Sequence, residues 1–217
     1  SYNALMKLDV YFVDAFTDKV FSGNPAAVIF TDIDDENLMQ KIAFENNLSE
    51  TAFVNTSQET NYIRWFSPIK EVDLCGHATL ASAYIYFNYI NKDEDKVSFM
   101  SASGELSVRK TDNLYELDFP KDNLKKIDLI DQVEDCIGAK PTETFIGDIN
   151  LFALLDNEET LKTLKPNFSK LINLEGQGLI VSSQSNEYDF VSRYFCPKFG
   201  INEDPVTGSA HTTLIPY

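Results

Sequence analysis

The sequence predicts an α+β fold of two pseudo-symmetric halves, in which each half is a mixed β-sheet curled around one central helix. The first observation is a repeated motif: an arginine, an aromatic residue and Phe occur at Arg64 and again at Arg193. Each copy continues through a Pro and a polar loop to a glycine, Gly76 or Gly208, that opens an apolar stretch. The second observation is a strand-rich order of elements with one central helix per half. The third is that both histidines, two of the three arginines and two of the three cysteines lie in these two segments. Such repetition is typical of a duplicated half-domain with a site between the halves.

The first half is expected to contain strands and two helices. Alternating apolar residues and β-branched or aromatic residues predict strands at 8–16, 26–30, 48–54 and 62–66, followed by three short strands within 97–119. Apolar residues at helical spacing predict helices at 35–47 and 76–89, of which the second is largely buried. Gly and Asn residues mark the turns, including the loop at 22–25 before the second strand.

A seam at residues 120–123 separates the expected halves, which are 7–119 and 120–217. In the second half we expect a helix at 127–137, short helices at 158–164 and 167–172, and strands at 143–146, 151–155, 178–182 and 188–195. The apolar stretch after Gly208 is much shorter than its counterpart after Gly76, so we expect the native protein to continue beyond Tyr217. The first residues resemble a tag remnant before a native Met6.

Composition limits the class of protein. The chain of 217 residues is 43% apolar and 24% charged, which is ordinary for a globular protein. No apolar run reaches the length of a membrane-spanning helix. Three widely spaced cysteines fit reduced thiols in a cytoplasmic protein. A formal net charge of −16 disfavours nucleic acid and anionic lipid as partners, so a small anionic metabolite would need local donors to bind.

The two repeated glycines are candidates for anion binding. A glycine at a loop-to-helix junction leaves backbone N–H groups free at the positive end of the helix dipole. Gly76 and Gly208 in matched contexts could therefore hold a carboxylate between the halves. The structural alternative is that each glycine only relieves a tight turn.

Three neighbours of these glycines are candidate binding residues. His77 is expected in the first turn of its helix, where the dipole lowers the imidazole pKa, unless it is a surface histidine. Asp204 precedes Pro205, and its carboxylate could accept from substrate or from His77, or could cap the turn. Ser209 could donate to a bound anion or cap its helix. His211, one turn further along, is expected to be a packed structural residue.

Glu50 is the candidate acid/base, because a carboxylate between apolar neighbours at a strand start would be partly buried and its pKa raised. Cys75 could act as a nucleophile or thiol acid/base at a helix N-terminus. The equivalent position in the second copy is Thr207, which argues against a two-thiol mechanism. Cys75 and His77 are a weak metal half-site, because no second Cys/His pair follows at zinc spacing, so no metal is expected.

Five stretches resemble the PhzF, or phenazine-biosynthesis-like, family. They are Val13-Asp14-Ala15-Phe16, Gly23-Asn24-Pro25-Ala26-Ala27-Val28, Leu48-Ser49-Glu50-Thr51-Ala52-Phe53, Leu74-Cys75-Gly76-His77-Ala78-Thr79-Leu80 and Glu203-Asp204-Pro205-Val206-Thr207-Gly208-Ser209-Ala210-His211. The resemblance covers the chain from near Lys7 to Tyr217. It implies a diaminopimelate-epimerase-like fold, a homodimer, and isomerisation of trans-2,3-dihydro-3-hydroxyanthranilate without metal or organic cofactor.

The resemblance also implies roles for individual residues. It places the proton-shuttling glutamate at Glu50 and substrate-binding positions at Gly76, His77, Asp204 and Ser209. Gly208 is a further substrate-binding candidate from its place at the second loop-to-helix junction, and Asn24, Cys75 and Thr207 are possible site residues. The leading hypothesis is therefore a cofactor-independent isomerase that moves a proton on a small carboxylate-bearing, cyclic or amino-acid-like substrate. The alternatives are a non-catalytic metabolite-binding protein on the same scaffold and a Cys75-dependent amino-acid epimerase.

Overall fold

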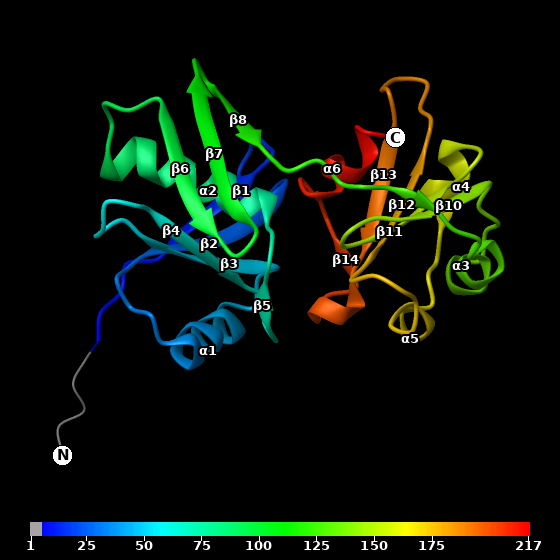
Figure 1. Cartoon of the computed structure of the whole chain (residues 1–217), viewed down its shortest axis with the longest axis horizontal. Coiled ribbons are helices and arrows are strands. Elements are labelled where there is room, and N and C mark those ends of the chain that lie inside the picture. The colour runs from blue at the N-terminus through cyan, green and yellow to red at the C-terminus, as the bar shows by residue number, and fades with distance from the viewer. Residues whose placement is uncertain (1–5) are drawn as a thin grey trace. The chain divides into compact units, whose positions relative to one another are not determined.

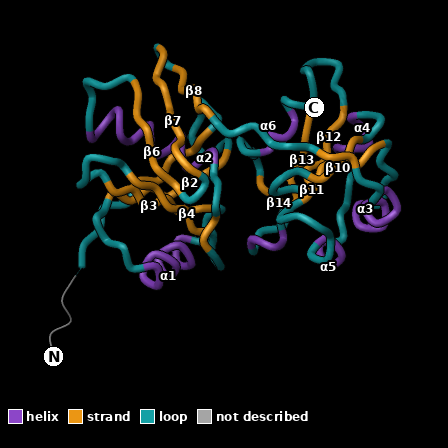
Figure 2. The backbone as a smooth tube through the Cα atoms, in the orientation of Figure 1, coloured by secondary structure: helices purple, strands orange, loops and turns teal. Residues whose placement is uncertain are grey.

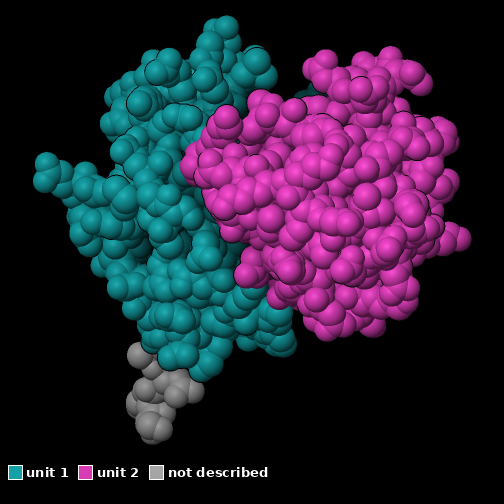
Figure 3. Space-filling model, turned by 45° about the vertical axis from the view of Figure 1, so that its right-hand side comes forward, with its two compact units in different colours: residues 1–119 teal, residues 120–217 magenta. Residues whose placement is uncertain are grey.

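The computed structural model describes residues 6–217, so the tag-like start lies outside the described residues. These residues divide into two compact units, one ending at Phe119 and the other running from Pro120 to Tyr217 (Figure 3). Within 6–217, no helix combines the length and apolar character that crossing a lipid bilayer requires.

The first unit is built on an eight-stranded mixed sheet (Figure 1). Its strand order is β1-β2-β3-β4-β6-β7-β8, and β5 pairs with β4 on a side branch. β2 and β3 run parallel, which requires the crossover that the first helix supplies. The strands are β1 (Tyr11–Ala15), β2 (Asn24–Phe30), β3 (Glu50–Asn55), β4 (Tyr62–Phe66), β5 (Glu71–Val72), β6 (Lys96–Ser101), β7 (Gly104–Thr111) and β8 (Leu114–Asp118).

The first helix of this unit, α1 (Glu36–Asn46), is fixed at both ends by short-range signals. The Asp35 carboxylate accepts from the Leu38 amide at its start, and Asn47 adopts the left-handed conformation, φ 50°, at its end. Met39 and Ala43 turn inward onto a core cluster of the sheet. The helix therefore covers one face of the sheet (Figure 1).

The second helix, α2 (Gly76–Ile85), is the central element of the first unit. Eight of its ten residues are buried, which agrees with a sequence that contains no Asp, Glu, Lys or Arg. It packs against β1, β2, β3 and β8, inside the curl of the sheet (Figures 1 and 2), and continues as a π-helical turn at Tyr86–Ile90.

The second unit has a six-stranded sheet in the order β14-β13-β12-β11-β10-β9. Its strands are β9 (Lys125–Lys126), β10 (Glu143–Ile146), β11 (Leu151–Leu154), β12 (Leu179–Ser183), β13 (Val191–Phe195) and β14 (Glu203–Asp204). Its helices are α3 (Ile130–Ile137), α4 (Glu158–Thr163), α5 (Phe168–Leu171), a 3-10 turn at Pro197–Phe199, and α6 (Ala210–Leu214). One core cluster contains Val133 of α3 and Leu161 of α4, and another contains Ala210 and Leu214 of α6.

The two units repeat one pattern of strand pairing. In the first, β1 to β5 pair in succession as antiparallel, parallel, antiparallel and antiparallel, and β10 to β14 do the same in the second. The repetition extends to side chains: Arg64 binds Glu71 through Nε and Nη2 at 2.7 and 2.8 Å, and Arg193 binds Glu203 at the same two distances. The predicted fold class is confirmed.

Some predicted boundaries differ from the structure. The helix expected at 127 begins at Ile130, because the Ile127 amide donates to the Thr144 carbonyl and the Leu129 amide to the Thr144 hydroxyl. The helix expected to open at Gly208 begins at Ala210. The two-residue strands β5, β9 and β14 were not predicted, since two residues carry no periodicity.

Candidate active site

Glu50 is the first residue of β3 and lies beside Ala26 of the parallel strand β2. The four residues that follow it in β3 are all buried, so the strand is anchored inside the sheet and holds the carboxylate at the end of the strand. The Glu50 side chain is 14% exposed, so it is largely removed from solvent.

Cys75 and His77 flank the start of α2. Cys75 is the N-cap residue, and its carbonyl accepts a hydrogen bond from the Thr79 hydroxyl at 2.5 Å. His77 lies in the first turn, as predicted, but its side chain is only 4% exposed, which rules out the alternative of a surface histidine. Both side chains are held by a helix that is itself buried.

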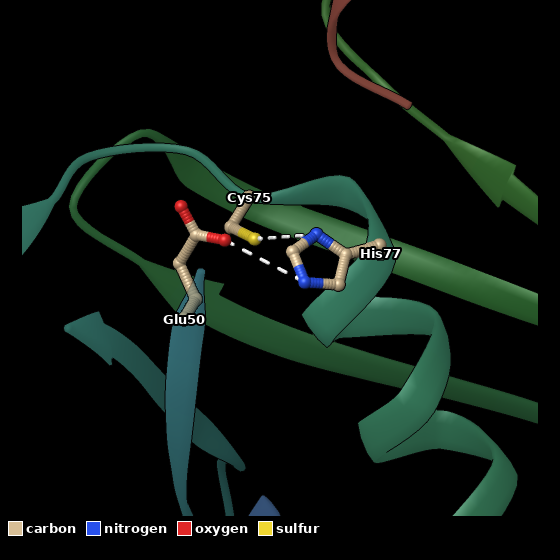
Figure 4. A group of neighbouring side chains, drawn as sticks. All are labelled: Glu50, Cys75 and His77. Atoms are coloured by element: carbon tan, nitrogen blue, oxygen red, sulfur yellow. Dashed lines mark hydrogen bonds and ion pairs between the residues drawn. The ribbon is translucent and has the colours of Figure 1, made fainter. Parts of the chain in front are cut away.

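Glu50, Cys75 and His77 converge into one cluster, which we call the Glu-Cys-His cluster (Figure 4). Sγ of Cys75 lies 3.5 Å from Nδ1 of His77, and Oε2 of Glu50 lies 3.5 Å from Nε2 of the same ring. One candidate ligand atom from each residue lies within 4.8 Å of the others. The cluster therefore combines a carboxylate, a thiol and an imidazole, three groups that take part in proton transfer.

Burial lowers the pKa of His77 to about 4, and the nearby backbone carbonyl of Pro25 opposes this effect. The imidazole is therefore neutral at pH 7, and its contact with Glu50 is not an ion pair at that pH. The direction of the shift agrees with the prediction from the helix dipole, but the cause is loss of hydration.

The start of β2 supplies further polar groups beside the cluster. Asn24 is fully buried, and its amide oxygen accepts from the Ser49 hydroxyl at 3.5 Å. Ser49 is the residue before Glu50, so this hydrogen bond connects the start of β2 to the start of β3. Sequence reasoning did not single out Ser49 or the Pro25 carbonyl, because neither belongs to a catalytic pattern.

In the second unit, the candidate residues lie between β14 and α6. The Asp204 carboxylate accepts from the Thr207 hydroxyl at 2.5 Å, so it caps this turn, which is one of the two roles considered for Asp204. Ser209 is the N-cap of α6 but makes no side-chain capping bond. His211 was predicted to be packed, and this is wrong: it is exposed, with Nδ1 3.1 Å from the Thr207 carbonyl. Gly208 precedes a helix of only five residues.

Strand pairing aligns the two copies residue by residue. Phe66 pairs with Thr51 and Phe195 pairs with Leu179, so the counterpart of Glu50 is the residue before Leu179, namely Gly178. A Cβ atom at Gly178 would lie 2.6 Å from the Tyr194 ring, so no larger side chain fits there without movement. The carboxylate at the strand start is thus present in the first copy alone.

A cavity of about 490 Å³ lies elsewhere in the first unit, at the other end of β3. Its lining includes Asp34, Asn55, Arg64 and Glu71, and none of the Glu-Cys-His cluster. Arg64 is held there by Glu71 and by exposed Asp34. Because this cavity contains none of the Glu-Cys-His cluster and its arginine is already paired, it is not the candidate active site.

Known proteins share this fold. The crystal structure of a hydroxyproline epimerase from Agrobacterium vitis matches with a TM-score of 0.56 at 10% identity, over 89% of this chain and 73% of that one, so the fold is that of the epimerases. A crystal structure described as a phenazine biosynthesis protein of the PhzF family, from Enterococcus faecalis, matches with a TM-score of 0.88 at 48% identity. That match covers 98% of this chain and 82% of the other.

Sequence comparison agrees with the structural match. A protein named as an uncharacterized isomerase in Pseudomonas aeruginosa is 44% identical over 214 residues, which are 98% of this chain and 82% of that protein. The model of the PhzC-PhzF family, phenazine biosynthesis-like protein, matches residues 13–217. The chain belongs to this family, and its class is isomerase-like at the level of the family.

Proposed function

We propose that the protein is a cofactor-independent isomerase in which Glu50 moves a proton on a small carboxylate-bearing substrate, cyclic or amino-acid-like. The observation that carries this proposal is the Glu-Cys-His cluster, in which a largely buried carboxylate faces a neutral imidazole at 3.5 Å. The family relatives named as isomerases support the reaction class.

In the proposed reaction Glu50 takes a proton from a substrate carbon. The electrons of the broken C–H bond move into the adjacent π-system or carboxylate, and the protonated Glu50 then returns the proton at another position. No atom is gained or lost, so the step needs no co-reactant. A buried carboxylate is suited to this role because little solvent competes for the proton.

The other candidates are proposed to bind the substrate. Neutral His77 can donate or accept one hydrogen bond at the reacting region, and the amides near Gly76 start a helix whose dipole favours a carboxylate. We assign the same binding role to Asp204, Gly208 and Ser209, and a supporting role to Asn24 and Thr207.

The copy-by-copy alignment supports one base rather than two. Racemisation by two thiols needs a second cysteine, and the position equivalent to Cys75 carries Thr207. The position equivalent to Glu50 carries Gly178, which has no side chain to act as a second base. A single group that removes and returns the proton is consistent with the lack of a second cysteine and of a second carboxylate at these two positions.

Turnover of dihydro-hydroxyanthranilate and of amino-acid analogues tests the proposal, comparing the protein with its Glu50→Gln variant. The amide keeps the size of the side chain but cannot take the proton. Glu45→Gln, at an exposed position of α1, is the matched control and should keep full turnover. Full turnover in Glu50→Gln would dispose of the mechanism.

A Cys75-dependent epimerase is the second candidate, because Sγ of Cys75 lies 3.5 Å from Nδ1 of His77 and the imidazole could accept the thiol proton. The two candidates separate by isotope. The measurement is the incorporation of deuterium from solvent at the substrate α-carbon. If Cys75→Ser loses this incorporation and Glu50→Gln retains it, the thiol mechanism is favoured.

We further propose that the protein acts as a cytoplasmic homodimer. Its three cysteines are buried and widely spaced in the sequence, which suits a reducing compartment. Light scattering after size-exclusion chromatography should give twice the chain mass, and a monomer mass would contradict the dimer.

A further inference from the structure

We propose that Glu50, Cys75 and His77 form a zinc-binding site, and that Zn²⁺ bound there inhibits the protein by occupying Glu50. The inhibitory part rests on the proposed function of Glu50. The binding part stands on the geometry of the Glu-Cys-His cluster alone, and the two parts are tested separately.

The donor set matches the chemistry of zinc. Thiolate sulfur, imidazole nitrogen and carboxylate oxygen are the three side-chain ligands that Zn²⁺ takes in proteins. With metal–ligand bonds of about 2.0 to 2.3 Å, tetrahedral geometry separates the ligand atoms by about 3.3 to 3.6 Å. A single metal ion uses one ring nitrogen, so one of the two 3.5 Å contacts already has this separation, and one ligand atom from each residue lies within 4.8 Å of the others. Zinc binding therefore requires side-chain movement of about 1 Å and no rebuilding of the backbone.

The buried imidazole provides independent support for a ligand. Nε2 of His77 is inaccessible to solvent and has no hydrogen-bond partner among the described residues, although it faces Oε2 of Glu50. A buried polar atom without a partner is unfavourable and calls for an explanation. A cation bound by Nε2 would give this nitrogen a partner and would be bound by the facing carboxylate as well.

The two 3.5 Å contacts involve opposite nitrogens of the ring, and a single imidazole nitrogen binds one metal ion. Binding through Nε2 keeps the contact with Glu50 and requires Cys75 to swing its sulfur away from Nδ1. Cys75 has one side-chain torsion, χ1, and rotation about it moves Sγ alone. The backbone of α2 can therefore stay in place.

Charge also favours a divalent cation. The thiolate and the carboxylate bring two negative charges, which balance Zn²⁺ in a buried site. Three protein ligands leave the fourth tetrahedral position open to solvent or to a substrate carboxylate. Because Glu50 would then donate its lone pair to the metal, it could not accept a proton.

Sequence alone gave this site little support, since Cys75 and His77 have no second Cys/His pair behind them. The third ligand comes from β3, twenty-five residues earlier, and the parallel pairing of β2 with β3 beside α2 brings it into reach.

Cobalt spectroscopy on the intact chain tests the binding part. We expect Co²⁺ to bind one per chain and to produce a thiolate-to-cobalt charge-transfer band with intense tetrahedral bands, which Zn²⁺ then removes by competition. Cys75→Ser should lose the thiolate band, whereas Cys136→Ser and Cys196→Ser, at the other two buried cysteines, should keep it. Glu50→Gln should keep the thiolate band and weaken Co²⁺ binding at least tenfold.

The absence of a thiolate band in the wild-type protein, or a band that survives in Cys75→Ser, would overturn the site. Circular dichroism verifies that each variant is folded. If Cys75→Ser fails to fold, equal Co²⁺ affinity in Glu50→Gln and wild type overturns the site by itself.

Turnover tests the inhibitory part. One equivalent of Zn²⁺ should abolish turnover, and a chelator should restore it. Unchanged or increased turnover with Zn²⁺ bound would overturn the inhibition and leave the site standing. If no substrate is turned over at all, the proposed function fails, and the cobalt spectrum still decides the site.

Discussion

The titration of His77 should make the protein less stable below pH 6.5. Its pKa is about 4 in the folded chain against 6.5 when unfolded, a lowering caused by burial. The folded state therefore favours the neutral ring, and the stabilising contribution is complete above the unfolded pKa and lost as pH falls towards 4. The difference in pKa corresponds to about 3 kcal/mol in total, of which about 2 kcal/mol is lost between pH 7.5 and pH 5.

Two measurements test this. The ring signals of the two histidines can be followed by NMR, and a His211→Gln variant assigns them, since the chain has no third histidine. The His77 signal should titrate with a midpoint near 4. Chemical denaturation at pH 7.5 and pH 5 should show that the wild type loses about 2 kcal/mol more than His77→Gln does.

The matched control is His211→Gln, because His211 is exposed and its removal leaves the buried ring in place. A midpoint of 6.5 or higher for His77 would mean that its contact with Glu50 is an ion pair, since a carboxylate partner raises a histidine pKa. In that case the wild type would lose no more stability than His77→Gln on acidification, and our account of a neutral imidazole would be refuted.

Three further predictions concern the scaffold and the thiol. In a denaturation assay, Gly23→Ala should destabilise the fold by about 3 kcal/mol or more, because φ is +68° and the new Cβ would lie 2.1 Å from the Ala15 carbonyl oxygen. The control is Gly138→Ala, which has a similar φ of +73° but, among the described residues, has no atom beyond its chain neighbours within 4 Å of the new Cβ, and it should cost about 1 kcal/mol. Equal costs would refute the steric part. Arg193→Lys should lower the free energy of unfolding by about 2 kcal/mol more than Arg64→Lys does. The reason is that Nη1 of Arg193 donates to two backbone carbonyls, whereas Nη1 of Arg64 donates to an exposed carboxylate. Similar melting temperatures for the two variants would contradict this. Cys75→Ser should keep turnover within about tenfold of wild type, and a loss as large as about 1,000-fold would favour the thiol mechanism.

The architecture could be predicted because the same sequence motif occurs once in each half of the chain. The Arg-aromatic-Phe strand and the glycine that follows it recur in a similar order, so the prediction for one copy supports the prediction for the other. The start of α6 was misplaced because Gly208 matches Gly76 in sequence, yet α2 begins at its glycine whereas α6 begins two residues later, at Ala210. Two-residue strands such as β14 exist through pairing with a distant partner, and such pairing leaves no local pattern.

The candidate site could be predicted in its members but not in its arrangement. Glu50, Cys75 and His77 were named from motif and resemblance, yet their convergence depends on β3 lying beside α2. The burial of His77, which lowers its pKa, follows from a helix in which eight of the ten residues are buried, whereas sequence offered only the helix dipole as a cause. The exposure of His211 was missed because its helix is only five residues long and was expected to be buried like α2.

The central claim is that one carboxylate carries the proton. Its most direct test is turnover in deuterated water with Glu50→Gln and the control Glu45→Gln, on whichever tested substrate the wild type converts. We predict that Glu50→Gln lowers the rate by about 100- to 10,000-fold while the control and the fold are unchanged. Wild-type turnover by Glu50→Gln would contradict the account.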